Sequence, residues 1–128
     1  MTDKLKPSQM MNKVFVYVNS LARELRKVLQ DKFEHEHKGM SLDTVESALR
    51  GEVEKWINTR DKNTKLTHMK TTKGKSGEVT LYYSGQTKDA AFKLIVNAFF
   101  TLVQAHDKLI TYLKAIQITV DKRDIVLD

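Results

Sequence analysis

The fold is decided by the longest apolar stretch of the chain, residues 87–117, which read TKDAAFKLIVNAFFTLVQAHDKLITYLKAIQ. Apolar residues recur in this stretch at intervals of three and four, which is the spacing of one helix face. One row of that face consists of Phe92, Ile95, Phe99, Leu102, Leu109, Leu113 and Ile116, and a second row consists of Val96, Phe100, Val103 and Ile110. The spacing therefore predicts one long core helix that packs against several neighbours.

A continuous helix over this stretch would be roughly 45 Å long, more than the roughly 30 Å across a small domain. The helix must therefore break, protrude or pair with a second chain. From Ile116 to Val120 apolar and polar residues alternate, which favours a helix end near Ala115 and a short extended tail that also takes in residues 125–127. A helix that continues to Val120 is the alternative.

Two amphipathic helices are predicted before this stretch. The first covers residues 10–34 and has an apolar face made of Val14, Val18, Leu21, Leu25, Val28, Leu29 and Phe33. Because this spacing also resembles a coiled-coil seam, a dimer helix is an alternative to a core helix.

The second helix is capped by Ser41 or Asp43 and ends in the polar residues 58–63. Its apolar face is made of Leu42, Val45, Leu49, Val53, Trp56 and Ile57. Gly51 lies inside this helix at a cost of roughly 1 kcal/mol, so it marks either close packing or a weak point.

Between residues 65 and 84 the apolar residues recur at every second position, which is the spacing of a strand, and no longer at every third or fourth position. Residues 65–72 and 78–84 predict two strands, and the glycine-containing connection 73–77 predicts a β-hairpin. Residues 1–9 are polar and contain Pro7, which predicts a loose N-terminal arm. Residues 10–128 are expected to form a single α+β domain with two amphipathic helices, a β-hairpin, one long core helix and a short extended C-terminal tail.

Composition excludes several classes of protein. The 128 residues include no cysteine, which excludes disulfides, thiolate catalysis and cysteine-ligated metal centres. The first residues lack the apolar core of a signal peptide, and no stretch has 18 uninterrupted apolar residues. We therefore expect a cytoplasmic protein without a membrane partner.

The positive charge is concentrated in one short segment. The formal net charge is +6, and residues 60–75 contain six lysines and arginines against one acidic residue, Asp61. Residues 76–128 contain six basic and six acidic residues, so this part of the chain is neutral. A focused positive field attracts polyanions, whereas evenly spread charge mainly aids solubility.

A phosphate-binding loop is excluded by the residues around the hairpin turn. Gly74-Lys75-Ser76 resembles the end of such a loop, but the motif needs a glycine at position 69, which is methionine here. The motif also needs a helix after the loop, whereas a strand is predicted. We therefore expect no nucleotide hydrolysis.

Three histidines raise the possibilities of metal binding and catalysis. His35 and His37 are two residues apart and could share a metal ion, but no third ligand is evident, and histidine is also common near helix ends. His106 occupies an otherwise apolar position, where a hydrogen-bonded core histidine is the simpler interpretation. No nucleophile motif accompanies these residues, so we expect a protein that is not an enzyme and has no cofactor or metal.

The hairpin carries the strongest functional signal, because lysines, hydroxyls and glycine amides suit phosphate contacts, and Tyr82 suits base stacking. We expect a small nucleic-acid-binding or regulatory protein, with DNA or RNA equally open and little sequence selectivity, since lysine is a point charge. The expected contact residues are Arg60, Lys62, Lys65, Lys70, Lys73, Lys75 and Tyr82.

A protein–protein interaction module is the alternative, in the form of an adaptor, inhibitor or assembly subunit. It would form a homodimer or bind another protein through the apolar surface of the long helix. The residues expected at this interface are Val96, Phe100, Val103 and Ile110.

Overall fold

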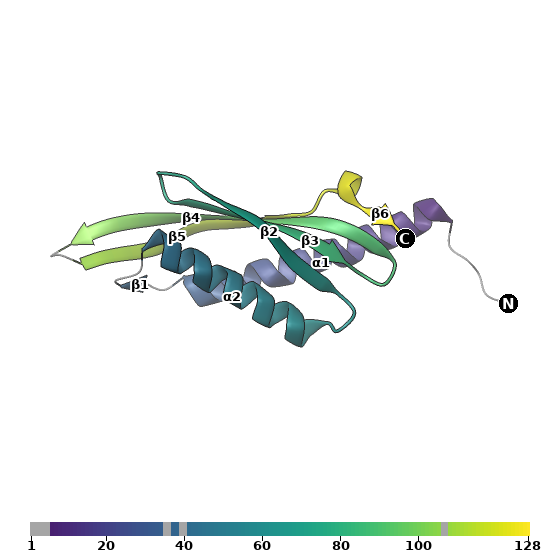
Figure 1. The fold of residues 1–128 in the computed structure, drawn as a ribbon, viewed down its shortest axis with the longest axis horizontal. Helices are drawn as coiled ribbons and strands as arrows, with labels where there is room; N and C mark the ends of the chain where they lie inside the picture. The colour runs from purple at the N-terminus through teal and green to yellow at the C-terminus, as the bar shows by residue number, and fades with distance from the viewer. Residues whose placement is uncertain (1–5, 35–36, 39–40, 106–107) are drawn as a thin grey trace.

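Two helices lie against one face of an antiparallel sheet (Figure 1). The computed structural model describes residues 6–34, 37–38, 41–105 and 108–128. Its elements, in chain order, are α1 (Pro7–Phe33), β1 (His37–Lys38), α2 (Leu42–Arg60), β2 (Lys65–Lys73), β3 (Glu78–Gln86), β4 (Ala90–Ala105), β5 (Lys108–Thr119), the 3₁₀ helix η1 (Lys122–Asp124) and β6 (Val126–Leu127). The strand order is β1-β5-β4-β3-β2, with β6 paired to β4. The chain therefore has an α+β fold, which confirms the predicted class.

The long core helix predicted for residues 87–117 is wrong. This stretch forms β4 and β5, which pair with each other in antiparallel fashion along most of their length. Every second residue of β4 from Phe92 to Phe100 is buried, while Ile95 and Phe99 stand on the other side of the strand. Because apolar residues occupy both sides of the strand, they also complete a helical stripe, so the period alone could not separate the two structures. Folding the stretch back as two strands also removes the excess length of a single helix.

α1 has the predicted amphipathic pattern but begins earlier than expected. It starts at Pro7, and residues 7–9 of the predicted arm are therefore helical. Proline suits the first position of a helix because the backbone N–H that it lacks would have no partner within the helix. Residues 1–5 of that arm lie outside the described residues. The buried residues of α1 pack into the core of this chain, as expected of a core helix: Val14, Val18, Leu21, Ala22, Leu25, Leu29 and Phe33.

α2 begins at one of the two predicted caps. The Oγ of Ser41 accepts a hydrogen bond from the Thr44 N–H at 3.2 Å, which satisfies one of the free donors of the first turn. The apolar face is buried as predicted at Val45, Leu49, Val53 and Ile57, and Trp56 packs partly buried against it. Gly51 is exposed, and a side chain added there would meet open space, so it is a weak point rather than a close contact.

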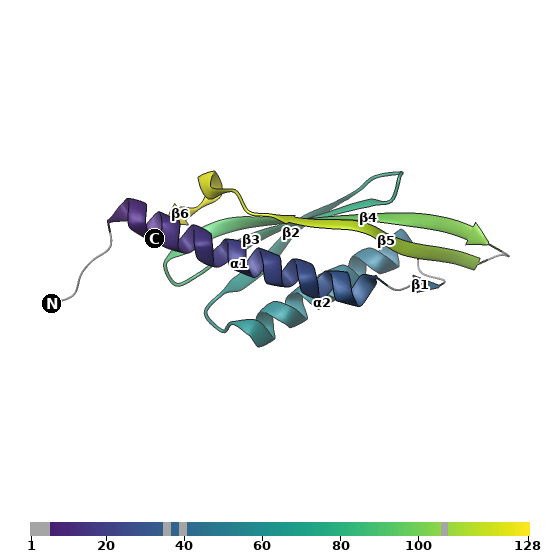
Figure 2. The same cartoon turned by 180° about the vertical axis from the view of Figure 1, so that it is seen from behind.

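The core lies between the helices and the sheet face that they cover (Figure 2). α1 packs against β4 and β5, and α2 packs against β2 and β3. Full burial of a valine, leucine or phenylalanine side chain is worth about 1.5–3 kcal/mol, so this single layer is the main source of stability. The sheet supplies alternate residues to it: Val79, Leu81, Tyr83, Phe92, Leu94, Val96, Ala98, Phe100 and Ile116.

β2 and β3 pair antiparallel where the hairpin was predicted. The hairpin is not free-standing, because β3 also pairs with β4 along its whole length. A bulge between His68 and Lys70 leaves Met69 63% exposed. The pairing register gives the inward face of the first part of β2, where Leu66 and His68 lie opposite the buried Gly85 and Tyr83.

The tail differs from both sequence-based alternatives. Residues after 116 are extended, as favoured, but they continue β5, which starts far upstream at Lys108. The tail does not pair with itself: β6 pairs with the start of β4, at Ala90 and Ala91. η1 lies between the two extended segments.

The turn between β2 and β3 is fixed by a glycine. Gly77 has a φ of 96°, a left-handed conformation that side chains disfavour. Its carbonyl oxygen accepts a hydrogen bond from the Phe100 N–H at 2.8 Å, which docks the turn on β4. A Cβ at this position would overlap the Phe100 carbonyl oxygen.

Gly77→Ala is expected to lower the free energy of unfolding by about 1–3 kcal/mol, through backbone strain and this overlap. Gly51→Ala is the matched control and should raise it by about 0.5–1 kcal/mol, because alanine has the higher helix propensity and the space is open. Urea denaturation of both variants measures the difference. A Gly77→Ala protein as stable as the parent would contradict this account of the turn.

Candidate functional site

The sheet face opposite the helices is covered by neither α1 nor α2. η1 lies above this side of the sheet near β6, and both helices lie below the sheet in the two ribbon views (Figures 1 and 2). We call this surface the open face. Strand alternation and pairing register assign it Lys65, Thr67, Lys70, Thr72, Glu78, Thr80, Tyr82, Ser84, Gln86, Ala91, Lys93, Ile95, Asn97, Phe99, Thr101, Val103, Tyr112, Ala115, Gln117 and Thr119.

Three of the seven predicted nucleic-acid contacts lie together on the open face. Lys65 and Lys70 come from β2, and Tyr82 comes from β3 directly opposite Lys70. The Lys70 Nζ lies over the Tyr82 ring, 4.6 Å from its centroid, in a cation–π contact. The bulge at Met69 makes this possible, because it returns Lys70 to the same side as Lys65.

Four predicted contacts lie elsewhere, and two of them form ion pairs. Arg60 pairs with Glu24 of α1 at 2.7 Å, and its hydrogen bond lowers the pKa of Glu24. Lys73 points to the helix side and pairs with Asp43, whose hydrogen bond raises the pKa of Lys73. The other two are exposed, Lys62 in the connection between α2 and β2 and Lys75 in the turn after β2.

The structure adds Lys93, which the sequence did not single out. Lys93 is exposed on β4 and pairs in register with Ser84, so it stands on the open face near Tyr82. As a position in a supposed helix, Lys93 looked like one more solvated charge. A period of two over residues 90–100 would have placed it on the polar side.

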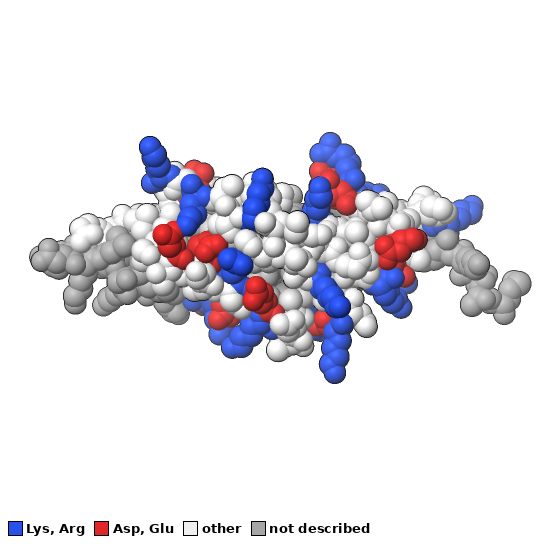
Figure 3. Space-filling view, in the orientation of Figure 1, with Lys and Arg blue, Asp and Glu red and all other residues white. Residues whose placement is uncertain are grey.

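The open face has an unbalanced charge. Among its described residues Lys65, Lys70 and Lys93 face a single acid, Glu78, which accepts a hydrogen bond from the Ser76 hydroxyl at 3.0 Å. The space-filling view shows basic side chains along the upper edge with acidic side chains beside some of them, and both signs over the helices (Figure 3). The open face is therefore the side with the greater attraction for an anion.

The apolar interface predicted from the sequence does not exist as one surface, because it required a helix. Val96 and Phe100 are 0% and 2% exposed in the core of the chain. Val103 is 39% exposed on β4. Ile110 pairs in register with Val103, and its side chain lies outside the described part of the chain.

A polar network is buried between α2 and the hairpin. The Glu46 Oε1 accepts a hydrogen bond from the Thr71 hydroxyl at 2.8 Å, and Thr71 bonds the Nε2 of His68 at 2.7 Å. The His68 ring lies edge-on to the ring of Tyr83 at 5.6 Å between centroids. Burial raises the pKa of the Tyr83 hydroxyl, which has no hydrogen-bond partner among the described residues. These contacts join α2 to the hairpin.

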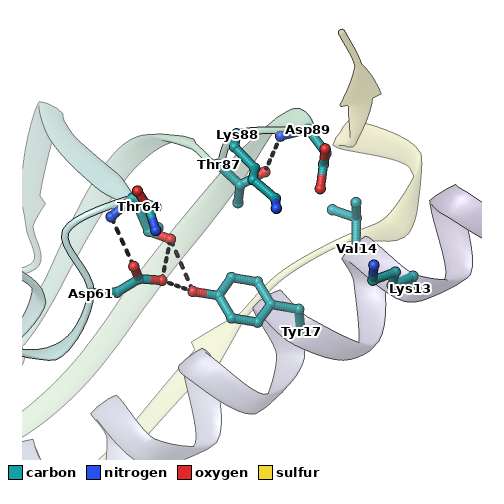
Figure 4. Close-up of a pocket in the computed structure, with 9 residues that line it drawn as sticks. Lys13, Val14, Tyr17, Asp61, Thr64, Thr87, Lys88 and Asp89 are labelled. Atoms are coloured by element: carbon teal, nitrogen blue, oxygen red, sulfur yellow. Dashed lines mark hydrogen bonds between the residues drawn. The ribbon is translucent and has the colours of Figure 1, made fainter.

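A pocket of about 310 Å³ lies between α1 and two loops, one before β2 and one before β4 (Figure 4). Its lining includes two lysines and two aspartates, Lys13 and Lys88 with Asp61 and Asp89, so its formal charges cancel. A balanced lining offers a polyanion no net attraction. The sequence missed this pocket because its residues come from three separate segments with no shared spacing.

One wall of the pocket is held by a carboxylate network. Asp61 accepts hydrogen bonds from the Tyr17 hydroxyl, from the Thr64 hydroxyl at 2.7 Å and from the Asn63 N–H at 2.8 Å. These bonds lower the pKa of Asp61, while burial and the bond to Asp61 raise the pKa of Tyr17. The network ties α1 to the start of β2.

Thr87, the first residue of the stretch that was predicted as a helix, lies on the loop side of the pocket. Its Oγ accepts hydrogen bonds from the N–H groups of Asp89 and Ala90, at 3.1 and 3.0 Å. It therefore makes cap-like bonds, but they close the turn into β4 rather than start a helix.

The described residues include no group of three metal-ligating side chains that could hold an ion, and no helix among them is long and apolar enough to cross a membrane. His35 and His106 lie outside the described residues, as does the side chain of His37. Comparison of the chain with protein-family models, curated proteins and solved structures returns no match.

Asp61→Asn is expected to lower the free energy of unfolding by about 1–2 kcal/mol at pH 7, because the charged acceptor of two hydroxyls is lost at a partly exposed site. The folded pKa of Asp61 lies below its unfolded value. The stabilisation is therefore present above about pH 4 and is lost as the pH falls through the folded pKa.

Urea denaturation from pH 7 to pH 2.5 measures this dependence, and the difference between Asp61→Asn and the parent should shrink at the acid end. Asp31→Asn, at an exposed position of α1, is the control and should change stability by less than about 0.5 kcal/mol throughout. A difference for Asp61→Asn that stays constant with pH would contradict the role of its charge.

Proposed function

We propose that the protein is a small, cytoplasmic, non-enzymatic nucleic-acid-binding protein that contacts phosphates with little sequence selectivity. The observation that carries the proposal is the unbalanced charge of the open face, where three lysines stand against Glu78. Lys75, exposed in the hairpin turn, adds a fourth cation beside this surface. The proposal keeps the hairpin as part of the site and extends the site to β4.

The side chains around these lysines suit phosphate groups. Thr67, Thr72 and Ser84 are exposed hydroxyls on the same face, and hydroxyls bond phosphate oxygens without reading a base. The cations of the open face, in its described part, are all lysines. Lysine acts as a point charge and lacks the planar fork with which arginine recognises guanine. These features support binding driven by phosphate charge.

Replacing three lysines together tests the proposal. The variant Lys65→Ala/Lys70→Ala/Lys93→Ala should bind a mixed-sequence DNA or RNA fragment at least tenfold more weakly at low salt. If each lysine meets one phosphate, the slope of log affinity against log salt should fall by about 2–3. Fluorescence anisotropy over a range of salt concentrations measures both quantities.

The matched control is Lys27→Ala/Lys32→Ala/Lys55→Ala, which removes the same charge from exposed positions on the two helices. It should leave the salt slope nearly unchanged. If the control weakens binding as much as the open-face variant, the binding comes from net charge and not from this surface. A parent protein that binds no nucleic acid at low salt would refute the proposal.

A second candidate function, a protein–protein interaction module, is favoured by the far end of β4. Leu102 and Val103 are adjacent, so they point to opposite faces of the strand, yet they are 37% and 39% exposed. Figure 1 shows β4 and β5 extending beyond the helices at this end. Exposed apolar side chains on both faces would suit a contact with a second protein chain.

If this end forms a homodimer, sedimentation at micromolar concentration should give twice the mass of the chain, and Val103→Glu should give the monomer mass. Val16→Glu, at a valine of α1 that is 64% exposed, controls for the added charge and should leave the mass unchanged. A parent protein that is strictly monomeric would exclude the homodimer form of this candidate.

A further inference from the structure

Three aromatic side chains interrupt the polar surface of the open face. They are Tyr82 on β3, Phe99 on β4 and Tyr112 on β5. Phe99 is 37% exposed, and the two tyrosines are half-buried. Neither α1 nor α2 covers this side of the sheet, and part of each ring surface is in contact with water.

The pairing register sets the spacing of these rings. Phe99 pairs with Ala115, and Tyr112 pairs with Thr101, two residues farther along β4. Phe99 and Tyr112 are therefore near one another on adjacent strands, on either side of the register shift between Phe99 and Phe100. Tyr82 lies on the neighbouring strand, four residues beyond Glu78, the partner of Phe99, which is about 13 Å along the strand direction. The rings thus form a line across three strands.

The cations lie at the Tyr82 end of this line. Lys70 is directly opposite Tyr82, with its ammonium over the ring, and Lys93 pairs with Ser84, diagonal to Tyr82. Rings next to cations occur where proteins bind unpaired bases and the phosphates between them.

We infer that the nucleic acid bound by the open face is single-stranded, and that its bases stack on Tyr82, Phe99 and Tyr112. Lys70, whose ammonium lies over the Tyr82 ring in this structure, moves from the ring to a phosphate, and Lys65 and Lys93 meet neighbouring phosphates. This inference rests on the proposed function and names its substrate class. Bases in a duplex are stacked on one another and present only their edges, so they cannot use a flat platform of rings.

The projecting end of β4 and β5 offers the main route to a duplex, because a two-stranded ribbon fits the major groove. The residues of β4 described at this end are Thr101, Leu102, Val103 and Gln104, and none is charged. A ribbon that enters a groove runs between two phosphate backbones and needs cations. The described lysines assigned to the open face lie beside the platform, at the opposite end of the sheet, and the test below separates the two surfaces.

The test compares single-stranded DNA and RNA oligonucleotides of mixed sequence with a duplex of the same length at one salt concentration. The parent protein should bind the single strands at least tenfold more tightly than the duplex. The variant Tyr82→Leu/Phe99→Leu/Tyr112→Leu keeps apolar bulk but removes the rings, and it should lose at least tenfold in single-strand affinity. Its salt slope should stay that of the parent, since no cation is removed.

Phe15→Leu, at a partly buried aromatic residue of α1, is the control and should bind like the parent. Circular dichroism and the thermal midpoint check the fold of each variant, and the three single variants replace the triple one if it is unfolded. Equal affinity for duplex and single strands, or a ring-free variant that binds normally, overturns the inference while lysine-dependent binding stands.

Two other outcomes also overturn the inference. Loss of a parent dimer in the ring-free variant would assign the face to a second copy of the chain. No binding to any nucleic acid at low salt would refute the proposed function and this inference together.

Discussion

β4 hydrogen-bonds to β3, β5 and β6, and the rest of the structure depends on this shared strand. Its backbone groups can be satisfied only if neighbours pair on both sides, because a buried unpaired N–H or C=O is costly. Its alternate side chains from Phe92 to Phe100 need an apolar cover, which α1 supplies from one side, while α2 packs against β2 and β3. The pairing and the cover together fix where every other element lies.

Because the helices cover only one face of the sheet, the basic residues fall into two groups. One group forms ion pairs between elements, and the other is exposed on the open face. Arg60 joins α2 to α1 through Glu24, and Lys73 joins β2 to α2 through Asp43. Both lie toward the helices, where the elements meet, and exposed pairs of this kind contribute little free energy each. Lys65, Lys70 and Lys93 lie on the other side of the sheet without such partners among the pairs described. The charge that remains available for an anion is therefore on the open face.

The sequence predicted those elements whose signals are local. The apolar face of α1, the Ser41 cap of α2 and the glycine turn between β2 and β3 each depend on residues within a few positions of one another. β4 and β5 were missed because Ile95 and Phe99, on the open side, fill the gaps of a helical stripe. Of the candidate site, Lys65, Lys70 and Tyr82 were found from composition, but Lys93 and the stacking line could not be found without the strand register.

By itself the sequence determined an α+β chain with two amphipathic helices, a two-stranded hairpin and a positive charge concentrated in residues 60–75. Only the tertiary structure decided that residues 87–117 are two strands, since backbone pairing with β3 and burial under the helices outweigh a period that fits either element. The same pairing decided which lysines share a face with Tyr82, Phe99 and Tyr112. Neighbouring side chains of a strand point to opposite sides of the sheet, and only the pairing register shows which of these sides the helices cover.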